Sequence, residues 1–198
     1  AALVTGIITM MFNWTMLRYV GEDGVAAVTI IMYVLMFASS LYTGYSYGVA
    51  PMISFYHGEQ NREKLKKLAA LSLKVIAVIA VLTVAASFLL TKPLVSTFVR
   101  PDNPVYVLAV TGNRLCTIAL FFIGFNIFAS GMFTALSNGI VSAVLAFSRS
   151  FVFMAAAMLV LPLFLGVNGI WLATPAAELM ALSLSVFMFL KYRKRYGY

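Results

Sequence analysis

Long apolar stretches separated by short polar segments constrain this chain more than any other feature. A helix needs about 20 consecutive apolar residues to cross a bilayer, and six ranges approach or exceed that length: 3–17, 25–56, 68–90, 105–135, 140–161 and 169–190. The residue-by-residue alternation that a membrane barrel strand needs is absent from them. Hydrophobic residues make up 63% of the chain and charged residues 10%, which is far from the balance of a water-soluble domain. We therefore predict an all-α integral membrane protein with six transmembrane helices.

The basic residues predict the orientation of these helices. They gather in the loop after the second helix (Arg62, Lys64, Lys66, Lys67) and in the segment 191–198 (Lys191, Arg193, Lys194, Arg195). With six helices, this loop and this segment fall on the same side, and the positive-inside rule makes that side the cytoplasm. We therefore expect a multi-pass protein of the cell (inner) membrane with a basic cytoplasmic tail over 191–198. The formal charge of +8 belongs to these flanks, so it does not indicate a nucleic-acid partner.

One short stretch, Gly44-Tyr-Ser46-Tyr-Gly48, matches the letters of the G-x-S-x-G nucleophile elbow of serine hydrolases. A serine nucleophile needs a base within about 3 Å. The only histidine is His57, and a continuous helix would separate it from Ser46 by roughly 16 Å of rise. We therefore expect no catalytic residue, and a non-enzyme, with an intramembrane serine protease as a remote alternative. The sequence also contains no metal-site or nucleotide-binding motif, so we predict no metal site and no cofactor.

The same stretch predicts a bend in the second helix. Gly44 and Gly48 share one face and would let a neighbouring backbone approach closely. Pro51 removes a hydrogen-bond donor, and its ring clashes with the carbonyl of Tyr47. Such a bend lets the two parts of a transporter helix move against each other, while in other membrane proteins it is a static packing kink, and these residues favour neither reading.

Three stretches together resemble one family, the multidrug and toxic compound extrusion (MATE) transporters. They are GYSYGVAPMISFYHGEQN over residues 44–61, GFNIFASGMFTALSNG over 124–139, and the segment from Arg149 through Leu161-Pro162 to Trp171. The resemblance extends over essentially the whole chain, and the order and spacing of its parts are more specific than any single motif. It implies twelve helices in two six-helix lobes, of which this chain resembles the C-terminal lobe, with the N-terminal lobe missing as a partner.

The resemblance also implies a function. Family members export organic cations and drugs in exchange for sodium ions or protons, through a cavity between the lobes that opens alternately to each side of the membrane. Some branches carry cation-binding carboxylates in the first and fourth helices of this lobe. This sequence offers only Asn13 in the first, and Asn113, Arg114 and Asn126 in the fourth. Asn113 and Asn126 are therefore candidates for lining a cavity, although a membrane asparagine more often bonds to another helix.

Glu178 is the only acidic residue within a predicted membrane stretch. It and Arg149 lie at similar depth near the midplane, within roughly 5 Å at 1.5 Å per residue. A lone charge there is costly, so we expect the two to pair. The pair is either a permanent link between the last two helices or a carboxylate that releases Arg149 to bind a proton, sodium or a cationic drug.

Three alternatives to the two-lobe exporter remain open. A related flippase for lipid-linked oligosaccharides would carry several cationic residues facing pyrophosphate, whereas this chain has few at mid-membrane. The protease alternative depends on Ser46. A homodimer of this chain would form the cavity from two copies, with membrane lipid and the drug as the other partners.

Overall fold

The computed structural model describes residues 2–198, and these residues form helices without any strand. The elements in chain order are α1 (Ala2–Tyr19), α2 (Glu22–Gly58), α3 (Arg62–Leu89), α4 (Thr91–Ser96), α5 (Pro104–Ala135), α6 (Gly139–Phe147), the π-helical segment η1 (Ser148–Phe153), α7 (Met154–Leu165) and α8 (Val167–Tyr196). Because α6, η1 and α7 follow one another without a break, the described chain contains six long helical stretches. The all-α fold predicted from the apolar stretches is confirmed.

Five of these stretches are long and apolar enough to cross a membrane, judged by length and composition: Glu22–Gly58, Arg62–Leu89, Pro104–Ala135, Gly139–Leu165 and Val167–Tyr196. Helix α1 is not among the five. It has 18 residues and carries Asn13 and Arg18, which lower its mean hydropathy. The described structure therefore has the six long helices that were predicted, and five of them have the length and composition of a membrane span.

The helix ends differ from the predicted ranges where polar residues continue a helix. Helix α3 begins at Arg62 instead of residue 68, because the side chain of Asn61 accepts a hydrogen bond from the Lys64 N–H at 3.1 Å and caps its first turn. Helix α8 continues to Tyr196, so most of the segment 191–198, expected as a tail, is helical. Tyr196 is buried, and its hydroxyl accepts a hydrogen bond from Asn138 at 3.0 Å. The end of α8 is therefore fixed to the α5–α6 corner.

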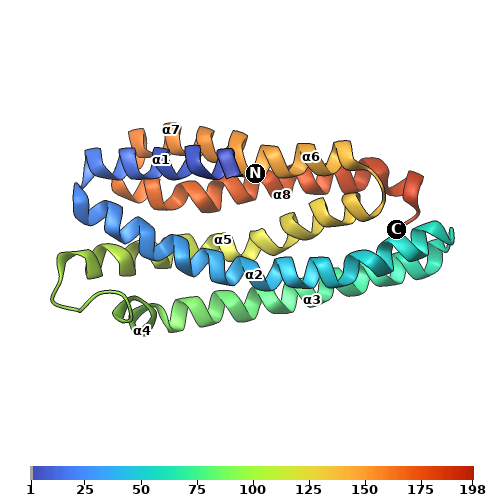
Figure 1. Cartoon of the computed structure of the whole chain (residues 1–198), viewed down its shortest axis with the longest axis horizontal. Helices are drawn as coiled ribbons and strands as arrows, with labels where there is room; N and C mark the ends of the chain where they lie inside the picture. Colours follow the sequence, from blue (N-terminus) through green and yellow to red (C-terminus); the bar gives the residue numbers. More distant parts are fainter. Residues whose placement is uncertain (1) are drawn as a thin grey trace.

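Helix α5 is the centre of the bundle. It crosses α2 in the view of Figure 1, with α3 on one side and α8 on the other, and its principal neighbours are α2, α8 and α3. More than half of its most apolar window is buried inside the protein. Buried side chains form two clusters, one that includes Tyr42 and Phe133 and one that includes Trp171 and Met16. Helix α1 covers only one end of the bundle, beside α7 and α8 (Figure 1).

Another helix approaches closely at Gly124 and Gly131 of α5, but not at Gly44 or Gly48 of α2. A Cβ atom at Gly124 would overlap the ring of Tyr42, and one at Gly131 would overlap the hydroxyl of Ser46. By contrast, no atom of another described element lies within 4 Å of a Cβ placed at Gly44 or Gly48. Within residues 2–198 this face of α2 meets no neighbouring element, and the packing role of Gly44 and Gly48 stays a prediction. Pro51 lies inside α2, which continues to Gly58, and the predicted bend stays a prediction.

Candidate functional site

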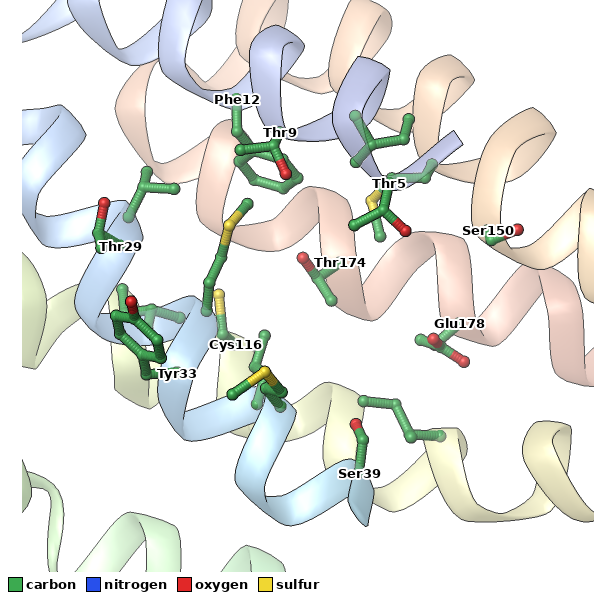
Figure 2. A pocket seen from close by; sticks show the side chains of 18 of the residues that line it. Thr5, Thr9, Phe12, Thr29, Tyr33, Ser39, Cys116, Ser150, Thr174 and Glu178 are labelled. Carbon is green, nitrogen blue, oxygen red and sulfur yellow. The ribbon is translucent and has the colours of Figure 1, made fainter. Parts of the chain in front are cut away.

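A cavity with a volume of about 530 Å³ lies among α1, α2, α5, η1, α7 and α8. Figure 2 shows Thr5 and Thr9 of α1, Thr29, Tyr33 and Ser39 of α2, and Thr174 and Glu178 of α8 around it. The remaining wall is mostly apolar and includes Phe12, Trp171 and three methionines: Met32, Met36 and Met154. Concave, largely apolar sites with a few polar groups are typical ligand sites.

An ion pair lies in the wall of this cavity. The Nε of Arg149 donates to both carboxylate oxygens of Glu178, at 2.8 Å to Oε1 and 2.9 Å to Oε2. The predicted pairing of these two residues is therefore present in the structure. The Glu178 side chain is 5% exposed, whereas that of Arg149 is 25% exposed. The carboxylate thus lies deeper than the cation that compensates it.

Asn126 of α5 completes the environment of the carboxylate. Its Nδ2 donates to Glu178 Oε2 at 2.8 Å and to the Glu178 carbonyl oxygen at 2.9 Å. Its Oδ1 accepts a hydrogen bond from Ser185 at 3.0 Å, which turns the amide so that the NH₂ group faces Glu178. Asn126 and Ser185 are both buried. The Glu178 carboxylate therefore accepts three hydrogen bonds from two other helical elements, and these bonds and the Arg149 charge compensate its burial.

Arg149 belongs to the π-helical segment η1, between α6 and α7. A π-helical turn changes the register of the side chains on either side of it, and such turns occur frequently at functional sites. Ser150, the next residue, also lines the cavity. Its hydroxyl donates back to the carbonyl of Ala146 at 2.7 Å. The sequence does not predict this segment, because no glycine or proline interrupts the apolar run.

Asn113, the other candidate asparagine, lies away from the ion pair. Its Nδ2 donates to Thr91 Oγ1 at 3.1 Å and to Ser87 Oγ at 3.4 Å, which places it in a buried cluster that links α3, α4 and α5. Thr117 adds a hydroxyl contact to Ser87 at 2.8 Å. Asn113 does not line the 530 Å³ cavity, so its contacts are those of a structural interhelical link.

Pro175 lies inside α8 and changes the hydrogen bonding of the turn before it. Because proline has no N–H, the carbonyl of Trp171, four residues earlier, lacks its usual partner within α8. The thiol of Cys116 donates to this carbonyl at 3.2 Å from α5. This contact joins α5 to α8 one turn before Thr174 and two turns before Glu178, and both residues line the cavity.

The serine considered as a nucleophile lies far from the histidine that could act as its base. Ser46 and His57 both lie in α2, and a helical rise of 1.5 Å per residue separates them by roughly 16 Å. Ser46 is buried against α5 at Gly131, and the ring of His57 packs on Tyr196 at a centroid distance of 5.5 Å. Among the described residues, no group of three His, Cys, Asp or Glu side chains could hold a metal ion.

Sequence reasoning found the ion pair but not the rest of the cavity. A signal for one wall was available: Thr5, Thr9 and Asn13 are spaced by four residues, which places three polar side chains on one face of an apolar helix. Thr174 and Glu178 repeat this spacing in α8.

The chain matches one protein family and is similar to solved transporter structures. The family model MatE matches residues 2–159. A multidrug resistance MATE family transporter of the MOP superfamily is similar in its outward-facing conformation (22% identity, TM-score 0.87, 98% of this chain and 43% of that chain). The inward-facing conformation of a multidrug resistance MATE family transporter of the MOP superfamily is also similar, with 22% identity and a TM-score of 0.88. The match covers 98% of this chain and 44% of that chain.

A third similar structure is the Vibrio cholerae MATE transporter VcmN in the bent form, with 17% identity and a TM-score of 0.86, covering 97% of this chain and 44% of that one. At these identities the likeness shows the fold. The chain spans less than half the length of these solved transporters. No curated protein matches the sequence.

Proposed function

The chain belongs to the MatE family, and from this premise we propose that it is one six-helix half of a secondary active exporter of drugs and organic cations. In this proposal a second six-helix half completes the transporter, and substrate leaves in exchange for sodium ions or protons by alternating access. The multi-pass protein resides in the cell membrane with its basic C-terminal segment in the cytoplasm, as the positive-inside rule suggests.

The observation that carries the proposal is the cavity of about 530 Å³ in a chain whose family match covers residues 2–159. Its aromatic rings offer faces that attract positive charge, and its methionines adapt to ligands of different shape. Hydroxyl groups of Thr9, Thr29 and Thr174 add adaptable hydrogen-bond partners. Such a lining suits a range of apolar organic cations better than one polar metabolite.

The similarity to two conformations of one kind of transporter gives further support. The chain matches the outward-facing and the inward-facing structures with TM-scores of 0.87 and 0.88. Similar agreement with both is what we expect if each half moves largely as a body while the cavity changes its opening.

The coupling ion needs a carboxylate that can exchange its partner. All three hydrogen bonds to the Glu178 carboxylate group within the described structure come from Arg149 and Asn126, so both oxygens already have a donor and Arg149 compensates the negative charge. Coupling through this half therefore requires that Arg149 leaves Glu178 during the transport cycle. Otherwise the coupling carboxylates belong to the second half.

The test is efflux of a fluorescent organic cation from cells that express the complete reading frame. An ionophore that collapses the sodium gradient and one that collapses the proton gradient are added separately. We expect efflux above the empty-vector control that is abolished by one of the two ionophores. Absence of efflux by a folded, membrane-inserted protein would refute the proposal and favour the flippase for lipid-linked oligosaccharides.

A further inference from the structure

We propose that the cavity of this half binds a carboxylate group of its ligand at the free end of the Arg149 guanidinium. The inference rests on the proposed transport function for its physiological meaning, but the binding site itself can be tested separately. Of the two charged side chains in the cavity, Arg149 and not Glu178 would face the ligand.

The geometry of the ion pair leaves most of the Arg149 hydrogen-bond donors unused. Arg149 contacts Glu178 through Nε alone, which donates to both carboxylate oxygens. An arginine that pairs side-on or end-on with a carboxylate would use a terminal nitrogen as well. Within residues 2–198, neither terminal nitrogen of Arg149 makes a hydrogen bond to another residue. Four N–H donors therefore remain for a ligand or water.

Arg149 and Glu178 differ in how deeply they are buried. Arg149 lines the cavity with a side chain that is 25% exposed, while Glu178 is 5% exposed and is also covered by Asn126. Of the described side chains that line the cavity, only these two are charged. A ligand in the cavity thus meets the positive end of the pair, and the carboxylate serves to fix the guanidinium in place.

The free end of the guanidinium selects a carboxylate group on the ligand. The planar fork of a guanidinium matches a carboxylate with two parallel hydrogen bonds. Because Glu178 already compensates much of the Arg149 charge, the site favours a group of one negative charge over a phosphate monoester, which carries about 1.5 to 2 negative charges at neutral pH. The apolar lining around Phe12, Trp171 and the methionines requires that the rest of the ligand be largely apolar.

The experiment uses two dyes with the same chromophore: rhodamine B, which carries one carboxylate, and rhodamine B ethyl ester, in which that group is masked. Their dissociation constants are measured by fluorescence anisotropy on the purified complete transporter. The proteins compared are wild type, Glu178→Gln, Arg149→Lys, the double variant Arg149→Gln/Glu178→Gln, and Arg114→Gln. Arg114 is an exposed arginine of α5 that does not line the cavity, so its variant is the matched control.

We expect wild type and Arg114→Gln to bind the acid about 10-fold more tightly than the ester, the scale of a charge-assisted hydrogen bond. The double variant, which leaves no unpaired charge, should lose this preference while its affinity for the ester stays within about threefold. Glu178→Gln should keep or increase the preference, because the guanidinium then lacks its own carboxylate. Arg149→Lys should retain the charge but reduce the preference, since an ammonium has no fork.

Equal affinity for acid and ester in wild type, or a preference that persists in the double variant, would overturn the inference. A preference that Glu178→Gln abolishes would also overturn it, because the carboxylate would then be the ligand-facing group. If efflux of the cationic ester depends on an ion gradient but no Arg149-dependent preference exists, the inference fails and the transport proposal stands. If the preference exists without gradient-dependent efflux of either dye, the site stands and the transport proposal fails.

Discussion

The ion pair between Arg149 and Glu178 predicts an asymmetric effect of removing either partner on stability. Arg149→Gln leaves a carboxylate that is 5% exposed, with Asn126 as its remaining donor. Breaking a buried pair in this way costs about 3–5 kcal/mol. Glu178→Gln leaves instead a guanidinium that is 25% exposed and faces a cavity where water can reach it. We expect its cost to be smaller, about 1.5–3 kcal/mol, on the scale of one lost hydrogen bond to a charged group.

The double variant Arg149→Gln/Glu178→Gln should be more stable than Arg149→Gln alone, because no unpaired charge remains. Equilibrium unfolding of the purified complete protein in mixed micelles of increasing SDS content would measure these differences. The Arg114→Gln variant should change the free energy of unfolding by less than about 0.5 kcal/mol, as is usual for exposed sites. The reasoning is refuted if Glu178→Gln destabilises the protein as much as Arg149→Gln, since Glu178 would then not be the buried charge that needs compensation.

Two further predictions concern helix packing and access to the cavity. A Cβ at Gly124 would overlap the buried ring of Tyr42, so Gly124→Ala should lower the free energy of unfolding by about 1–3 kcal/mol. Gly44 has open space around it, so Gly44→Ala should be neutral or should stabilise the protein by up to about 1 kcal/mol. Both are measured by the same SDS titration, and equal losses would contradict the packing. Ser39 lines the cavity, so in a Cys116→Ala background Ser39→Cys should react with a membrane-impermeant maleimide, and saturating substrate should slow this reaction severalfold. Unchanged labelling with substrate would place the substrate outside this cavity.

The helices were predictable because a bilayer-spanning helix requires a long apolar run, and such runs are visible without any tertiary information. The pairing of Arg149 with Glu178 was also predictable, since two opposite charges at similar depth in an apolar medium have no better partner. Asn126 could not be assigned to this pair from sequence. Its distance from Glu178 depends on how α5 packs against α8, and its orientation depends on Ser185.

Other features could not be predicted because they depend on tertiary contacts. The π-helical turn at Ser148–Phe153 has no sequence signal. The glycines of α2 looked like packing sites, yet close packing occurs at Gly124 and Gly131, where bulky or polar side chains of α2 face α5. A small-residue spacing indicates that a helix can be approached closely, but the neighbouring helix determines whether that face is used.

The central proposal is that this chain forms half of an ion-driven exporter, and transport by the purified complete protein in liposomes tests it most directly. An inward-directed or outward-directed gradient of sodium ions or protons is imposed across the liposome membrane, and uptake of the rhodamine ester is followed. The account predicts that dye accumulates only when one of the two ions runs down its gradient in the direction opposite to the dye. Equal dye movement with and without either gradient, by a protein shown to be inserted and folded, would contradict it.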